Sequence, residues 1–99
     1  MVGLELLVEI RTEKRTEFLQ LFDLLKSTGA PFIDRTKIEL FERVNAPDIF
    51  LWREHWENSQ SLEDYYTQNA FRSMLGAISI LGKLLHMKTF SFEEEGQDV

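Results

Sequence analysis

Hydrophobic and polar residues alternate at the start of the chain. Every second residue from Leu4 to Ile10 is apolar, and two of the three residues between them are glutamates. A period of two residues is typical of a β-strand with one buried face. We therefore predict a strand over residues 3–11.

The period then changes to that of a helix. From Phe18 to Leu25 apolar residues recur at steps of three and four, which places them on one side of an amphipathic helix. This spacing predicts a helix over residues 13–28. Gly29 suits the left-handed position that follows many helices, and Pro31 cannot easily continue one.

Two further alternating segments follow, over residues 36–44 and 49–56. The residues between them, Asn-Ala-Pro-Asp at 45–48, have turn chemistry, because Pro47 fixes its own φ and the flanking Asn and Asp tolerate turns. The pattern therefore predicts a β-hairpin.

The second half of the chain predicts two helical stretches and a last strand. Ser61, with Asp64 three residues later, resembles a capping box at a helix start. From Ala70 large apolar residues recur at steps of three and four as far as Leu85. Residues 86–94 return to a period of two.

The predicted order is β-α-β-β-α-β, which is the ferredoxin-like pattern of the α+β class. It implies a four-stranded antiparallel sheet with helices packed on one face. We assign residues 1–93 to one domain and residues 94–99 to an acidic, flexible tail.

Bulky apolar residues fall on both faces of this predicted sheet. One layer of helices covers one face, and a large uncovered apolar patch usually marks an interface. We therefore expect a homodimer in which a second copy covers the open face. The residues expected there are Phe50, Trp52, Phe90 and Phe92. The alternative is that long charged side chains shield scattered aromatics.

Charge and composition exclude several kinds of partner and site. A formal net charge of −6 argues against nucleic acid and anionic membranes, because both need a basic face. The absence of cysteine excludes disulfides and thiolate chemistry and fits a cytoplasmic location. The two histidines, His55 and His86, have no flanking ligand cluster, so no metal site is expected.

The stretch FLWREHWENSQSLEDYYTQNAFRSM, residues 50–74, carries a family resemblance. It combines an aromatic strand, in which Glu54 lies two residues before Trp56, with a polar turn and a helix with Leu62 and Phe71 facing inward. Over residues 3–93 the chain resembles the antibiotic biosynthesis monooxygenase domain, a dimeric α/β-barrel family. The resemblance implies a homodimer whose sheets form a barrel, a pocket between sheet and helices, and oxidation of quinols or polyphenols by O2 without cofactor.

The chain departs from the family at several positions. Quinol-oxidising relatives often carry histidines where this chain has Tyr65 and Ala70. A haem-degrading branch carries a haem-ligating histidine at about Leu75. Because leucine cannot ligate iron, we reject haem degradation.

Five residues remain as candidates for a site. Tyr65 matches a pocket position of the family, and its phenol can donate a hydrogen bond to a substrate. His55 is a possible base near neutral pH. The alternatives are a core tyrosine and an interfacial histidine. Trp56 and Phe71 either stack on a ligand or only pack the core, and Asn69 either binds substrate or begins a helix.

Two functions stay open at this stage. The first is a cofactor-free monooxygenase that acts on a small aromatic or quinol-type substrate with O2. The second is a non-catalytic dimeric module that binds a hydrophobic small molecule or a protein partner. Composition and spacing do not choose between them, because one fold hosts many functions.

Overall fold

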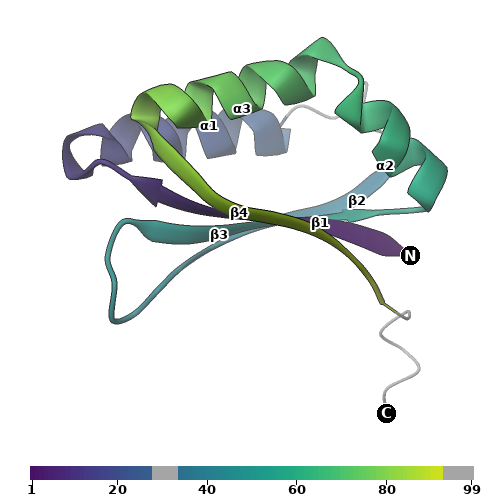
Figure 1. The fold of residues 1–99 in the computed structure, drawn as a ribbon, viewed down its shortest axis with the longest axis horizontal. Coiled ribbons are helices and arrows are strands. Elements are labelled where there is room, and N and C mark those ends of the chain that lie inside the picture. Colours follow the sequence, from purple (N-terminus) through teal and green to yellow (C-terminus); the bar gives the residue numbers. More distant parts are fainter. Residues whose placement is uncertain (28–33, 93–99) are drawn as a thin grey trace.

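The computed structural model describes residues 1–27 and 34–92. Its elements, labelled in Figure 1, are β1 (Val2–Ile10), η1 (Thr12–Lys14), α1 (Arg15–Ser27), β2 (Arg35–Glu42), β3 (Ile49–Trp56), α2 (Ser59–Tyr66), α3 (Asn69–Leu81) and β4 (Gly82–Ser91). The predicted order of strands and helices is confirmed. The expected helix end at Gly29 and Pro31 and the acidic tail lie outside the described residues.

The strands form one antiparallel sheet in the order β2-β3-β1-β4. The helices lie together on one face of this sheet, and the described part of the chain leaves the other face open (Figure 1). This is the predicted ferredoxin-like α+β arrangement.

The core lies between the sheet and the helices, and alternation produces it. On β1, Leu4, Leu6, Val8 and Ile10 are all buried, and on β3 the buried side chains are those of every second residue from Phe50 to Trp56. Buried residues on the helices recur at steps of three or four. They are Phe18 and Phe22 on α1, Leu62 and Tyr65 on α2, and Phe71, Met74 and Ile78 on α3.

Two residues expected on the dimer face belong to this core instead. The Phe18 ring of α1 lies 4.9 Å from the ring of Phe50, and the Phe22 ring lies 5.1 Å from Trp52. Both β3 side chains are therefore enclosed by their own protomer, and the expectation that they meet a second copy is corrected. The sequence pattern placed Phe50 and Trp52 on the open face, whereas they lie on the face that α1 covers. The two faces were hard to tell apart because both faces of β3 carry large apolar residues.

The last strand begins at Gly82, four residues before the sequence predicts. The apolar spacing of three and four continues past Leu81, and this hid the boundary. Gly82 lies so close to β1 that a Cβ there would be 2.0 Å from the backbone oxygen of Glu9. The chain therefore leaves α3 at the residue that allows close approach of two backbones.

The start of α2 also differs from the prediction. Asn58 is the N-cap residue, and its side-chain oxygen accepts a hydrogen bond from the backbone N–H of Ser61 at 2.9 Å. Ser61 is inside the first turn, and its hydroxyl donates to Asp34 at 2.5 Å instead. Asparagine is as good an N-cap as serine, so the polar run 57–61 offered two acceptable starts.

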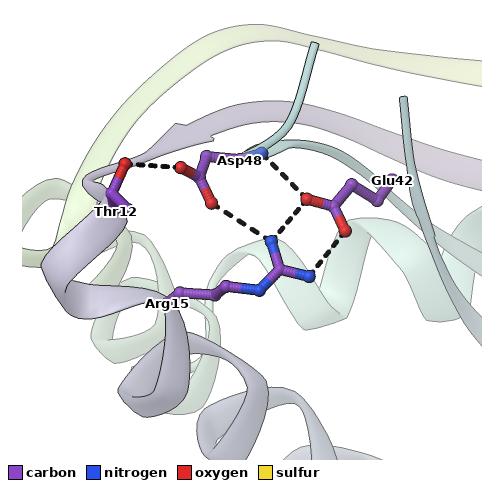
Figure 2. Close-up of polar contacts among 4 residues, drawn as sticks. All are labelled: Thr12, Arg15, Glu42 and Asp48. Carbon is purple, nitrogen blue, oxygen red and sulfur yellow. Dashed lines mark hydrogen bonds and ion pairs between the residues drawn. The ribbon is translucent and has the colours of Figure 1, made fainter. Parts of the chain in front are cut away.

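A charged cluster ties the β2–β3 hairpin to the start of α1 (Figure 2). The Arg15 guanidinium binds both oxygens of Glu42 and lies 3.1 Å from Asp48. Thr12 donates to Asp48 at 2.6 Å, and the backbone N–H of Asp48 donates to Glu42 at 2.8 Å. Asp48 has a φ of 72°, so these contacts hold the tight turn that returns the chain into β3.

None of the described helices is both long and apolar enough to span a bilayer.

Candidate functional site

A carboxyl group lies at the centre of the protein core. Glu54 is fully buried on β3, between Trp52 and Trp56 on the same strand face. Its oxygens accept hydrogen bonds from both indole N–H groups, at 2.9 and 3.1 Å. The Tyr65 hydroxyl of α2 donates a third bond at 3.2 Å. The period of two along β3 therefore places one acidic side chain among three polar hydrogens within an aromatic core.

A cation lies near this carboxyl group. The guanidinium of Arg35, which is 5% exposed, is 3.9 Å from Glu54 and also donates to the backbone oxygen of Leu25 at 2.8 Å. Arg35 begins β2 next to β3 in the sheet. It therefore offsets part of the cost of a buried negative charge.

Burial dominates the protonation of this site. Loss of water raises the pKa of Glu54, although Arg35 and the three hydrogen bonds act in the opposite direction. Burial, followed by the charge of Glu54, also raises the pKa of Tyr65. The pKa of the carboxyl group therefore lies above its ordinary value because of burial, and burial also disfavours ionisation of the Tyr65 phenol.

Aromatic rings surround the Tyr65 phenol. The Tyr65 ring lies 4.7 Å from Trp56 and 5.0 Å from Phe71, and its hydroxyl is also 3.8 Å from the sulfur of Met74. The structure therefore brings together three of the residues that the sequence singled out. Asn69 is not among them: it is exposed in the first turn of α3.

His55 lies on the opposite face of the sheet. Its ring is 4.6 Å from Phe92 and 6.2 Å from Phe90, and its Nε2 is 3.5 Å from a carboxylate oxygen of Glu39. Because successive strand residues point to opposite faces, β3 itself separates His55 from Tyr65. The structure does not bring the two predicted catalytic residues into one site. Phe90 and Phe92 lie on this same face, beside His55.

Sequence reasoning missed Glu54 and Arg35 as members of the site. The signal for Glu54 was present, since a charged residue that alternates with two tryptophans must share their face of the strand. A buried face carries a charge only where partners satisfy it. Arg35 gave no comparable signal, because its contact with Glu54 depends on the pairing of β2 with β3.

A small surface pocket lies beside this centre. Its volume is about 290 Å³, and it lies between α2 and the end of β4, with Leu62, Glu63, Tyr66, Thr89 and Phe90 among its lining residues. Neither Tyr65 nor a histidine lines it. The Tyr66 ring is 5.0 Å from Phe71 and 6.5 Å from Tyr65, so one ring separates the pocket from the buried phenol. Within the described ranges no three side chains of metal-binding type form a cluster.

The fold is one that solved structures share over nearly their whole length. A protein from Deinococcus radiodurans named as a candidate antibiotic biosynthesis monooxygenase has a TM-score of 0.81 at 18% identity, with 95% of this chain and 94% of that one covered. SnoaB from Streptomyces nogalater, a cofactor-independent oxygenase solved in a mutant form, has a TM-score of 0.81 at 12% identity, with 98% and 97% covered. A possible oxidoreductase from Bacteroides thetaiotaomicron has a TM-score of 0.77 at 20% identity, with 92% and 96% covered.

These likenesses establish the fold, which is the ferredoxin-like fold of proteins named as antibiotic biosynthesis monooxygenases. The sequence matches no family model and no curated protein. Sequence identities of this size leave the chemistry to be argued from the site.

Proposed function

We propose that this chain is a homodimeric, cofactor-free monooxygenase that oxidises a small aromatic or quinol-type substrate with O2. The observation that carries the proposal is the contact between Tyr65 and the buried carboxyl group of Glu54. A buried acid with a raised pKa is the usual form of a general base that works near neutral pH. Similarity to a cofactor-independent oxygenase over 98% of the chain supports the same class.

The proposed reaction begins with the removal of a proton from a substrate hydroxyl group. That proton passes to the Tyr65 oxygen while the Tyr65 proton passes to ionised Glu54. The substrate anion is electron-rich and gives one electron to O2, after which the two radicals combine at a ring carbon. The resulting peroxide anion takes the proton back from Glu54 through Tyr65, which restores the base, and the hydroperoxide then loses water. One oxygen atom stays as a carbonyl, the other leaves as water with two substrate hydrogens, and the substrate supplies all four electrons.

Access to Tyr65 requires a movement of the aromatic rings around it. The Tyr65 side chain is 3% exposed, so a substrate reaches its hydroxyl only when neighbouring rings move. The pocket beside Tyr66 is the entrance in this proposal. Its volume of about 290 Å³ is at the small end of ligand sites, which suits a substrate of one or two rings. Trp56 and Phe71 then supply the faces on which the ring stacks.

The open face of the sheet supports the homodimer of the proposal. Phe41 is 48% exposed there, and Leu7 and Leu51 lie beside it in register. Apolar groups that share one uncovered face favour an interface. In a symmetric dimer the open faces of the two copies would cover each other, because each copy uses the same patch.

The lack of cysteine suits a reducing compartment, and we assign the activity to the cytoplasm.

Oxygen uptake with a panel of hydroquinones tests the activity. We expect turnover well above autoxidation for the wild-type protein, and a loss of at least tenfold for Tyr65→Phe and for Glu54→Gln. Glu57→Gln, on an exposed residue three positions away, is the matched control and should keep full activity. Uptake that is equal in wild type and Tyr65→Phe would refute the proposed relay.

A second function is favoured by one specific observation. Both oxygens of Glu54 already accept hydrogen bonds, and its side chain has no exposed surface. In this second function the network only fixes the fold, and the chain is a non-catalytic dimeric module that binds a hydrophobic small molecule or a protein partner. That function predicts no uptake with any quinol and ligand binding that Tyr65→Phe leaves intact.

A further inference from the structure

One row across the open face of the sheet has a charged residue on every strand. The strand registers pair Glu39 with Arg53, Arg53 with Glu5, and Glu5 with Lys88. In the strand order β2-β3-β1-β4 the charges are therefore negative, positive, negative and positive. The Arg53 Nε lies 3.3 Å from Glu5, and the Lys88 Nζ lies 3.6 Å from the other oxygen of Glu5. We call these four residues the charged row.

Apolar groups border the charged row on both sides. On one side are Phe41, Leu51 and Leu7, which are in register with one another. On the other side the far end of the Phe90 ring lies against Gly3, where a Cβ would come within 2.1 Å of the ring. The Arg53 guanidinium is 4.7 Å from the centre of the same ring. When a second copy covers this face the charged row loses water, and its charges then need opposite charges across the interface.

We infer that the charged row sets the orientation of the two copies, with the two-fold axis parallel to the strands and between β1 and β3. This inference rests on the homodimer of the proposed function. An axis in this direction reverses the order of the strands across the interface, so β2 faces β4 and β3 faces β1. Glu39 then meets the partner's Lys88, and Arg53 meets the partner's Glu5. Each of the four charges in the row faces its opposite.

The other simple orientation gives the reverse result. A two-fold axis perpendicular to the strands, through the same row, places each strand opposite its own copy. Glu39 would then meet the partner's Glu39, and Lys88 would meet the partner's Lys88. All four contacts would join like charges in a poorly hydrated layer, where their repulsion is strong.

Glu39 and Lys88 provide the test, because they cannot affect each other within one protomer. They lie on β2 and β4, at opposite edges of the sheet. Glu39→Lys disturbs its own neighbours Lys37, His55 and Arg53, and Lys88→Glu disturbs Glu5. These local effects are additive for such distant positions. Any rescue in the double variant must therefore arise between protomers.

The experiment is sedimentation equilibrium of the full chain in low and high salt. We expect each single charge reversal to raise the dimer Kd about tenfold at low salt, or about 1.4 kcal/mol. The double variant Glu39→Lys/Lys88→Glu should return to within about threefold of wild type. Glu13→Lys, an exposed reversal on η1 outside the sheet, is the control and should leave the Kd unchanged. Thermal unfolding confirms that each variant folds.

The outcomes separate the two proposals. If the wild-type chain dimerises but the losses of dimerisation free energy from the two single reversals simply add in the double variant, this orientation is overturned and the homodimer stays intact. A wild-type chain that stays monomeric at micromolar concentration would overturn both the orientation and the homodimer. Rescue at low salt that fades at high salt supports the inference, because screening weakens ion pairs. Oxygen uptake is measured separately, so failure of the catalytic proposal gives a different result.

Discussion

Replacement of Glu54 is the sharpest test of how this core is held together. Glu54→Ala removes the acceptor of two indole N–H groups and one phenol, at 2.9, 3.1 and 3.2 Å. A buried donor without a partner costs about 1–3 kcal/mol, and loss of one member of a buried ion pair costs about 3–5 kcal/mol. These terms overlap, so we expect a total loss of about 4 kcal/mol. That is a large part of the stability of a domain, about 5–15 kcal/mol.

Glu54→Gln should have a smaller effect for a geometric reason. One Glu54 oxygen accepts from both Trp52 and Tyr65, and the other accepts only from Trp56. A glutamine oxygen can take the first place, but its NH2 group then faces the indole N–H of Trp56, and both are donors. One indole is left without an acceptor, which costs about 1–2 kcal/mol. Removal of the buried charge offsets part of this cost.

Urea denaturation followed by tryptophan fluorescence measures both variants, since both tryptophans of the chain contact the replaced group. Wild-type stability should also fall as the pH rises above about 4.3. In that range the folded state, in which the pKa of Glu54 is raised, binds more protons than the unfolded state. Glu54→Gln should lack this decline. A loss below about 1 kcal/mol for Glu54→Ala, or an unchanged pH dependence in Glu54→Gln, would refute the reasoning.

Three further predictions concern the edges of the fold. Arg15 lowers the pKa of Glu42 to about 2 from its ordinary value of 4.5. The pair therefore stabilises the fold above pH 4.5, and this stabilisation is lost as the pH falls toward 2. Arg15→Ala should remove that acid dependence, which urea denaturation at pH 5 and pH 3 measures. Gly82→Ala should cost about 2–3 kcal/mol in thermal unfolding, because the new Cβ would meet a backbone oxygen at 2.0 Å. Gly3→Ala should cost only about 1 kcal/mol, since it meets the movable Phe90 ring, but it should raise the dimer Kd in sedimentation.

The strand and helix pattern was readable because each element has one buried side. Alternation on β1 and the three-and-four spacing on α1 report directly which residues face the core. The end of α3 was not readable by the same rule. Leu84 and Leu85 continue the helical spacing past Gly82, and only the approach of β4 to the backbone of β1 shows why the helix ends there.

The two faces of β3 were harder to assign for a related reason. Phe50 and Trp52 alternate with Ile49 and Leu51, so both sets looked suitable for a core. The decisive residue was Glu54, whose carboxyl group needs the donors of its own face. A charged residue among aromatics on a strand was better evidence for a buried polar centre than His55, which is half-buried on the opposite face of the strand.

The role of Glu54 in stability and its proposed role in catalysis make opposite demands on one group. A base must be ionised to accept the substrate proton, whereas burial stabilises the fold most when the carboxyl group is neutral. If Glu54 is the base, oxygen uptake must rise with pH over the interval in which stability falls. If Glu54 is purely structural, stability should fall over this pH interval without a matching rise in oxygen uptake. The two pH profiles, measured on one preparation, therefore decide whether the centre of this core is a catalytic site or a structural network.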